Sequence, residues 1–139
     1  MSSNPTLLTN TEALLEGEGH RVTSTRRAIL KAIAETDIPL TIEEIMDRVP
    51  DIGRATVFRT VKLLHELGVI CRVVLENGGI RYVVSTLSHH HHLVCSICGS
   101  VTEFSSPELD QAIHEEAEEA AFKLSAHTVE LYGTCINCR

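Results

Sequence analysis

Two Cys-x-x-Cys pairs are the most specific chemical feature of this 139-residue sequence. A two-residue spacer lets both thiolates of a pair reach one ion, and two pairs complete a tetrahedral four-cysteine zinc site. The pairs are Cys95 with Cys98 and Cys135 with Cys138, with residues 99–134 between them. That gap is wide for an isolated zinc ribbon, but it suits an ion that joins the two ends of a folded helix and strand. The alternative is four unrelated reduced thiols.

Four consecutive histidines, residues 89–92, lead directly into the first cysteine pair. The run lies inside the chain, whereas a purification tag normally lies at a terminus. In an extended chain side chains alternate between two faces, so His89 and His91 point one way and His90 and His92 the other. We therefore predict two further metal sites, each completed from elsewhere. The candidate partners are Glu103, Glu108, Asp110, His127 and the fifth cysteine, Cys71. The alternative is a solvated histidine run with weak metal affinity.

The net charge of −7 is distributed unevenly along the chain. Residues 1–84 carry 10 Lys/Arg against 11 Asp/Glu, whereas residues 85–139 carry 2 against 8. The first part also contains two basic runs without acidic residues, RVTSTRRAILK and GRATVFRTVKLL. A basic face followed by an acidic second half predicts two domains, 1–84 and 85–139, with different partners.

The sequence also bears on the compartment. No stretch approaches the ~18 apolar residues of a membrane span, and the N-terminus lacks the basic and apolar regions of a signal peptide. We therefore expect a cytoplasmic protein without a membrane partner, in a reducing environment that disfavours disulfides. The paired cysteines then indicate metal ligands.

Residues 1–84 have the pattern of helices followed by a hairpin. Apolar residues recur at helical spacing in the segments 6–19, 24–36, 41–49 and 54–68, with Thr23 and Thr41 as N-caps. Two β-rich runs, 69–75 and 80–85, flank the hairpin signal ENGG. This order predicts a winged helix-turn-helix whose basic helix 54–68 enters a major groove. The alternative is a plain helical core with surface charge. The basic candidates for DNA contact are Arg21, Arg26, Arg54, Arg59 and Lys62.

Residues 85–139 predict a small α/β domain after a linker at 84–88. Short strands are expected at 91–95 and 100–104, and a third at 126–133. Between them an acidic amphipathic helix spans 106–124, with Ser106 as its cap and Pro107 at its first position. The predicted fold class is α+β.

Four segments of the chain resemble the ferric uptake regulator superfamily: RVTSTRRAIL, GRATVFRTVKLLHELGVI, HHHHLVCSICGSVTEF and HTVELYGTCINC. They follow the order of that family and span most of the chain. The resemblance implies a dimeric, metal-responsive repressor. Its N-terminal winged helix would bind a double-stranded DNA operator, and its C-terminal α/β domain would form the homodimer.

The resemblance also assigns roles to the candidate residues. The structural zinc ligands of the family match Cys95, Cys98, Cys135 and Cys138. A site inside the dimerisation domain matches His89, His91, Asp110 and His127. The regulatory site at the hinge between domains matches His90, His92 and Glu103. The base-contacting arginine matches Arg59, with Thr56 near the phosphates.

The chain departs from the family pattern at the hinge site and in the recognition helix. The family's TVYR is TVFR here, so Phe58 cannot make the hydroxyl contact of a tyrosine. Two usual ligands from the DNA-binding half are replaced, one by Pro39 or Leu40 and the other by Val83. Cys71 instead lies where zinc-responsive members place a ligand.

These departures bear on the effector metal. One cysteine, two histidines and one glutamate suit tetrahedral Zn²⁺, whereas Fe²⁺ and Mn²⁺ favour harder, higher-coordinate sets. We therefore expect a zinc uptake regulator that represses metal-uptake genes. The alternative is an iron- or manganese-responsive member in which Cys71 is a buried strand residue. A peroxide-sensing member is less favoured, because such members use an aspartate where this chain has Glu103.

Two rival functions make different demands on the sequence. A zinc hydrolase or deaminase needs an open coordination position and a general base, and the deaminase signature is His-x-Glu together with Pro-Cys-x-x-Cys. Neither cysteine pair follows a proline, and the single His-x-Glu, His114 to Glu116, has no such pair after it. We therefore expect no enzymatic activity. The second rival is a zinc-stapled interaction module without a DNA role, which a test of specific DNA binding would distinguish.

Overall fold

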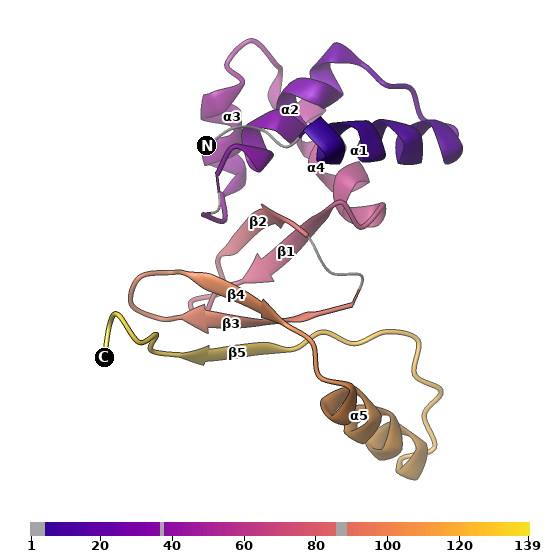
Figure 1. The fold of residues 1–139 in the computed structure, drawn as a ribbon, viewed down its shortest axis with the longest axis vertical. Coiled ribbons are helices and arrows are strands. Elements are labelled where there is room, and N and C mark those ends of the chain that lie inside the picture. Colours follow the sequence, from indigo (N-terminus) through magenta and orange to yellow (C-terminus); the bar gives the residue numbers. More distant parts are fainter. Residues whose placement is uncertain (1–4, 37, 86–88) are drawn as a thin grey trace. The chain divides into compact units, whose positions relative to one another are not determined.

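The computed structural model describes residues 5–36, 38–85 and 89–139, and divides the chain into two compact units (Figure 1). The first unit is Met1–Thr86 and the second is Leu87–Arg139. Most of the linker expected at 84–88 lies at residues 86–88, outside the described residues. No helix in the described ranges is long and apolar enough to cross a membrane.

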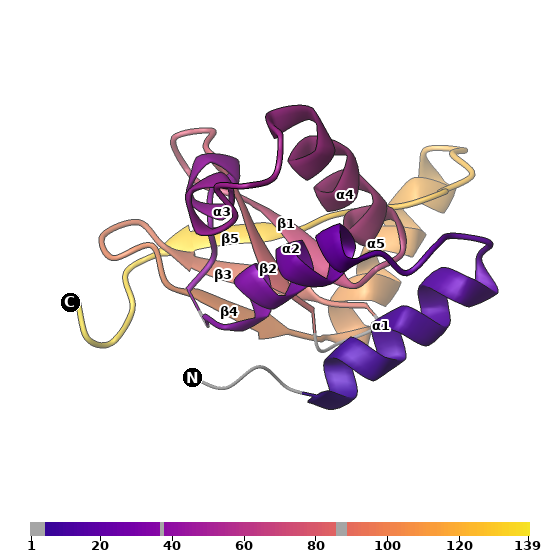
Figure 2. The same ribbon diagram turned by 90° about the horizontal axis from the view of Figure 1, so that it is seen from above.

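Four helices form the body of the first unit, and two of them begin at the predicted caps. Thr23 accepts a hydrogen bond from the N–H of Arg26, and Thr41 accepts one from the N–H of Glu44. Each hydroxyl thereby satisfies one backbone donor that a helix start leaves unpaired. Figure 2 shows α1 beside α2. The helices are α1 (Pro5–Gly17), α2 (Ser24–Ala34), α3 (Ile42–Arg48) and α4 (Arg54–Glu66).

A two-stranded antiparallel hairpin, β1 (Ile70–Val74) and β2 (Ile80–Val84), follows the helices. A backbone bridge between Leu40 and Tyr82 ties it to the segment before α3. Apolar side chains from α2, α3, α4 and β1 make one core, which includes Ile29, Ile33, Ile45, Val57, Leu64 and Ile70. Three packed helices and a hairpin form a winged helix-turn-helix, as predicted.

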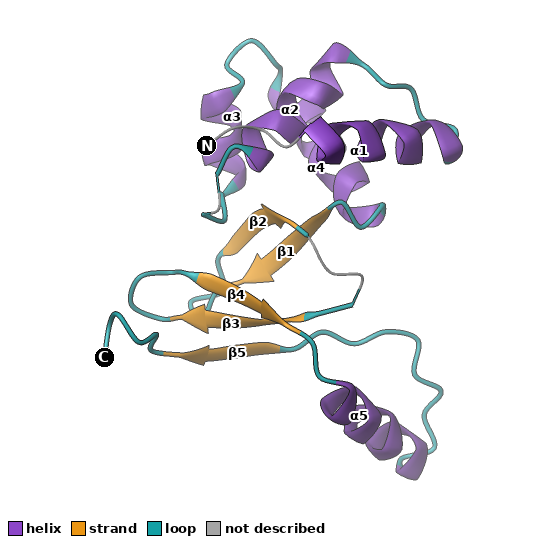
Figure 3. Ribbon diagram, in the orientation of Figure 1, coloured by secondary structure: helices purple, strands orange, loops and turns teal. Residues whose placement is uncertain are grey.

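The second unit is a three-stranded sheet and one helix (Figure 3). The strands lie in the order β4-β3-β5, with β3 antiparallel to β4 and parallel to β5. A parallel pair needs a long crossover, and here β4 and the helix α5 lie in that connection. The elements are β3 (His91–Cys95), β4 (Val101–Phe104), α5 (Pro107–Glu119) and β5 (Glu130–Gly133). The mixed α+β fold class is thus confirmed.

The helix α5 begins where the sequence predicts and ends earlier. Ser106 caps it and Pro107 occupies its first turn, but it stops at Glu119 rather than at Leu124. The N–H of Phe122 bonds to the carbonyl of Ala117, and the N–H of Ala121 to that of Glu118. These two bonds form a Schellman motif, which places Ala121 in the left-handed region at φ 60°. The strand β5 likewise begins at Glu130 rather than at residue 126.

The Schellman motif predicts opposite effects for two neighbouring substitutions. Ala121→Gly should stabilise the protein by up to about 1 kcal/mol, because glycine adopts φ 60° without the penalty that a Cβ imposes. Ala120→Gly should destabilise it by roughly 0.5–1 kcal/mol, because Ala120 has an ordinary φ of −83°. Denaturant unfolding of the two variants measures the difference. A loss of stability in Ala121→Gly would contradict this account of the helix end.

Candidate metal sites and DNA-binding face

The parallel pairing of β3 with β5 brings the two cysteine pairs together. Cys95 ends β3 and lies opposite Gly133, the last residue of β5, so the turns that follow the two strands meet. In the first turn Gly99 adopts φ 74° and its N–H bonds back to the carbonyl of Cys95. The N–H groups of Cys98 and Cys135 point at the Sγ of Cys95, at 3.5 and 3.4 Å.

The four thiols have the spacing that a zinc ion requires. All four Sγ atoms lie within 4.8 Å of one another. Those of Cys98 and Cys135 are 3.8 Å apart. A tetrahedron with Zn–S bonds of about 2.3 Å has an edge of about 3.8 Å, so this pair fits a shared zinc ion. We call these residues the four-cysteine cluster.

The surroundings shift the pKa values of two of these thiols, Cys95 and Cys138, in opposite directions. Backbone N–H groups, above all that of Cys135, lower the pKa of Cys95 to about 6, because they stabilise its thiolate. Hydrogen bonds with the thiols of Cys135 and Cys98 raise the pKa of Cys138 to about 12. The thiols of this cluster therefore differ in how readily they lose the protons that a bound metal ion displaces.

The sheet register sends the histidines of β3 to two faces. Directly opposed residues share a face, so His91 lies with Phe104 of β4, and His92 lies with Glu103. His92 is also opposite Glu130 of β5. The alternation expected for the histidine run is therefore present, and it separates two clusters.

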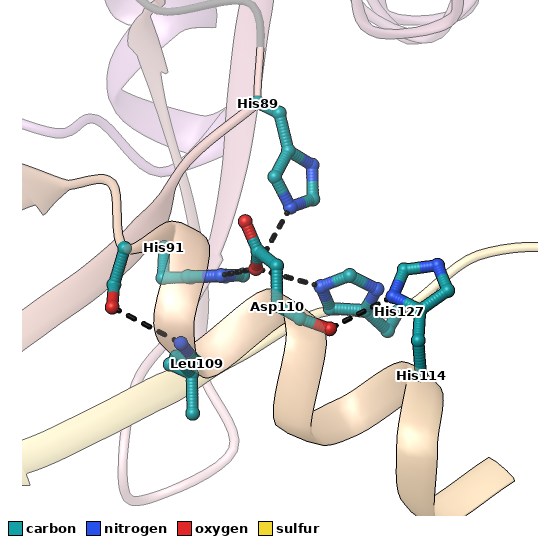
Figure 4. A network of polar contacts seen from close by, with 7 residues as sticks. His89, His91, Leu109, Asp110, His114 and His127 are labelled. Carbon is teal, nitrogen blue, oxygen red and sulfur yellow. Dashed lines mark hydrogen bonds and ion pairs between the residues drawn. The ribbon is translucent and has the colours of Figure 1, made fainter.

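The first of these, the Asp110 cluster, gathers three imidazoles around one carboxylate oxygen (Figure 4). The Nε2 atoms of His91, His89 and His127 lie 2.7, 3.3 and 3.3 Å from Oδ1 of Asp110. His91 comes from β3 and Asp110 from the first turn of α5, while His127 precedes β5. This set of three nitrogens and one oxygen matches ligands that zinc takes in proteins.

Asp110 is held as a carboxylate by its neighbours. The hydrogen bond from His91 is the main cause that lowers the pKa of Asp110 to about 2, with further hydrogen bonds from His89 and His127. His114 also belongs to this neighbourhood, since its Nδ1 lies 2.8 Å from the backbone carbonyl of Asp110. The ligand atoms that lie within 4.8 Å of one another here do not include one from His114.

The second, the His92 cluster, consists of His90, His92 and Glu103. Their ligand atoms lie within 4.8 Å of one another, and Nε2 of His90 is 3.8 Å from a carboxylate oxygen of Glu103. The rings of His90 and His92 meet edge to face, with centroids 4.9 Å apart. These three donors could fill three positions of a tetrahedral metal site.

The remaining predicted ligand, Cys71, belongs to the first unit. It is the second residue of β1 and is buried. Pro39 or Leu40 and Val83, which stand where other ligands were considered, have apolar side chains that cannot bind a metal. Among the three positions considered in the first unit, only Cys71 carries a donor atom. The candidate Glu108 is exposed on α5 and joins none of the three clusters.

The DNA-binding candidates lie just before α2, at its start, and on α4. A depression of about 640 Å³ connects these segments, and no acidic residue of the described ranges lines it. Its lining includes Arg21, Arg26, Thr56, Arg59 and also His20, which the sequence did not single out. Arg59 donates a hydrogen bond to Oγ1 of Thr56 at 3.2 Å. We call this surface the basic depression.

Two other basic residues on α4 differ in their surroundings. Lys62 is exposed. Arg54 instead pairs with Glu43 of α3 at 3.1 Å and lies over the ring of Phe58, 5.3 Å from its centroid. Arg54 would therefore have to exchange Glu43 for a phosphate in order to contact DNA.

Comparison with known proteins agrees with this architecture. The model of the ferric uptake regulator family matches residues 17–132. A ferric uptake regulation protein of Campylobacter upsaliensis is 35% identical over 138 residues, which cover 95% of this chain and 88% of the relative.

Solved structures give the same result. The ferric uptake regulator of Vibrio cholerae superposes with a TM-score of 0.65 at 33% identity, over 90% of this chain and 99% of that one. A zinc uptake regulator complexed with zinc and DNA has the same fold, with a TM-score of 0.80 at 22% identity over 94% and 91% of the two chains. Members of this family are metal-responsive, DNA-binding transcriptional repressors rather than enzymes. The chain belongs to the ferric uptake regulator family.

Proposed function

We propose that this protein is a zinc-responsive repressor that binds palindromic operators as a homodimer and controls metal-uptake genes. The observation that carries the proposal is the His92 cluster, in which two imidazoles and one carboxylate converge on one face of β3 and β4. Three donors leave one position of a tetrahedral zinc site to be filled. Cys71 is the ligand that we assign to that position.

The donor types favour zinc over iron or manganese. A thiolate and two imidazoles form a borderline-soft set, and four ligands match the coordination number that zinc prefers. An Fe²⁺ or Mn²⁺ site would be expected to use additional oxygen or nitrogen ligands. Leu40 and Val83 supply neither.

A ligand set drawn from both units explains how zinc would control DNA binding. Without metal, the two winged helices of a dimer sample many relative orientations. Zinc bound by Cys71 and the His92 cluster selects orientations that present both α4 helices to successive major grooves of a palindrome. Zinc would then raise DNA affinity without touching DNA.

The basic depression supports a DNA-binding role for the first unit. Its lining, as far as the structure describes the chain, has three guanidinium groups with hydroxyls between them and no carboxylate, which suits the phosphates of a DNA backbone. Arg59, the only basic residue of α4 in that lining, is our candidate for base contact. Lys62 would contact phosphate.

The second unit has surfaces that suit a homodimer. The strand β5 lies at one edge of the described sheet, so its outer backbone groups can pair with another strand. Leu93 and Leu131 are opposite each other and remain 45% and 44% exposed. No residue of α5 is buried within one described chain. A second copy would cover these apolar groups.

We assign two further zinc ions to the four-cysteine and Asp110 clusters. The zinc ion of the four-cysteine cluster would link the turns after β3 and β5. The zinc ion of the Asp110 cluster would link β3 to α5. An iron-responsive regulator is the second candidate function. It is favoured by the ferric uptake regulation protein that is 35% identical to this chain.

The effector metal is tested by DNA-binding titrations in buffered Zn²⁺ and in anaerobic Fe²⁺. Zinc should activate wild-type protein at a far lower free concentration than iron, because the proposed site is tetrahedral and contains a thiolate. Cys71→Ser should lose that response. Val73→Thr, which places a hydroxyl at another buried position of β1, should keep it. Equal activation by both metals, together with a wild-type response of Cys71→Ser, would favour the iron-responsive alternative.

The DNA face is tested by binding assays at several salt concentrations. Arg59→Ala should cost about 1–3 kcal/mol at the operator and reduce discrimination against other sequences. Lys62→Ala should weaken binding to all sequences and lower the slope of log affinity against log salt by about one. Lys123→Ala removes the same charge from the second unit and should have neither effect. Unchanged specificity in Arg59→Ala would contradict the assigned base contact.

The four-cysteine cluster predicts a difference between two Cys→Ser variants. Cys135→Ser should lose one tightly bound zinc ion and destabilise the second unit, because a hydroxyl is a poor replacement for a thiolate. Cys71→Ser should retain that ion. Zinc stoichiometry and thermal unfolding measure both effects. Lower pH should weaken this site, since binding displaces thiol protons. A full zinc complement in Cys135→Ser would show that this cluster does not hold a zinc ion.

A further inference from the structure

We propose that Glu130 is a positioning residue, whose carboxylate fixes His92 in the tautomer and orientation that present Nε2 to the metal. This inference deepens the proposed function and rests on it, because it takes His92 as a ligand. The sequence did not single out Glu130.

The contact is built into the sheet. Glu130 is the first residue of β5 and lies opposite His92 in the parallel register. The Nδ1 atom of His92 is 3.3 Å from Oε1 and 3.2 Å from Oε2 of Glu130. The side chains are 7% and 14% exposed, so little water competes for this contact. The backbone N–H of His92 also bonds to the carbonyl of Val129, which fixes the two strands at this point.

The chemistry of the pair determines the tautomer. An ionised carboxylate only accepts hydrogen bonds, so Nδ1 of His92 must carry the proton that it donates. In the neutral ring, Nε2 then has a free lone pair. This Nε2 is buried and has no hydrogen-bond partner among the described residues. Such an atom is costly to bury unless something binds it, and a metal ion satisfies that requirement.

The charge of Glu130 adds to this effect. A carboxylate behind a metal-bound imidazole orients the ring and increases its basicity, as in carboxylate–histidine–zinc arrangements. Oε2 of Glu130 is also buried, and its 3.2 Å contact with Nδ1 of His92 lacks hydrogen-bond geometry, so among the described residues no hydrogen bond satisfies this oxygen. A cation held by His92 would therefore stabilise a carboxylate that the fold leaves partly uncompensated.

The test compares Glu130→Leu and Glu130→Gln in the full-length protein. Leucine removes both the charge and the acceptor, whereas glutamine keeps an acceptor oxygen. Glu118→Gln on the exposed surface of α5 is the matched charge control. His92→Ala identifies which zinc-binding step belongs to the His92 cluster. Co²⁺ is added in place of zinc as a probe of folding. The charge-transfer band of Co²⁺ bound by the four-cysteine cluster reports whether each variant is folded.

Two readouts are needed. Nitrogen-15 spectra of the histidines in metal-free protein should show the Nδ1–H tautomer for His92 in wild type, and its loss in Glu130→Leu. Chelator competition with Zn²⁺ should show about 10- to 100-fold weaker binding at the His92 step in Glu130→Leu. Glu130→Gln should lose less zinc affinity at this step than Glu130→Leu, and Glu118→Gln should bind zinc as tightly as wild type.

The outcomes separate this inference from the proposed function. If His92→Ala removes a zinc-binding step that Glu130→Leu leaves intact, or if the His92 tautomer is unchanged, the positioning role is wrong while the metal site stands. If His92→Ala leaves every zinc-binding step unchanged, the proposed metal site itself is wrong. Weaker binding at the four-cysteine cluster in Glu130→Leu would identify a folding defect and overturn the positioning role.

Discussion

The parallel pairing of β3 with β5 is the constraint on which the second unit depends. One end of this pair brings Cys95 beside Gly133, and so joins the two cysteine turns. The other end brings His92 beside Glu130, just after His127 has reached the Asp110 cluster. A few backbone hydrogen bonds between strands that are distant in sequence thus align the donors of the four-cysteine and Asp110 clusters and place Glu130 beside His92. Zinc in the four-cysteine cluster would link the turns that follow β3 and β5, and so hold these two strands together at their C-terminal ends.

The sequence could predict the donor sets better than their supports. Period-2 alternation was enough to divide the histidine run, because it depends only on an extended backbone. The partnership of His92 with Glu130 requires the register of a parallel pair whose strands are separated by a helix, and alternation within one strand contains no such information. The contact of Arg54 with Glu43 likewise depends on how α3 packs against α4.

The helix boundaries show a related limit. Thr23, Thr41 and Ser106 cap their helices as predicted, because an N-cap is read from a few adjacent residues. The end of α5 was predicted too late, since alanines and apolar residues continue past Glu119 without a glycine or proline. Ala121 adopts a left-handed conformation, which an alanine at this position does not predict. Local chemistry therefore marked where helices begin more reliably than where this one ends.

The uniformity of the histidine run has a consequence for how the second unit folds. A strand that slips by one residue exchanges its two faces, but four identical side chains would still present histidines on both. The run therefore cannot select its own register. That choice falls to Cys95, which must meet the turn after β5, and to Val94, which is buried on the opposite face. Cys95 and Val94 thus fix the register of the strand, and this register determines which partners each histidine meets.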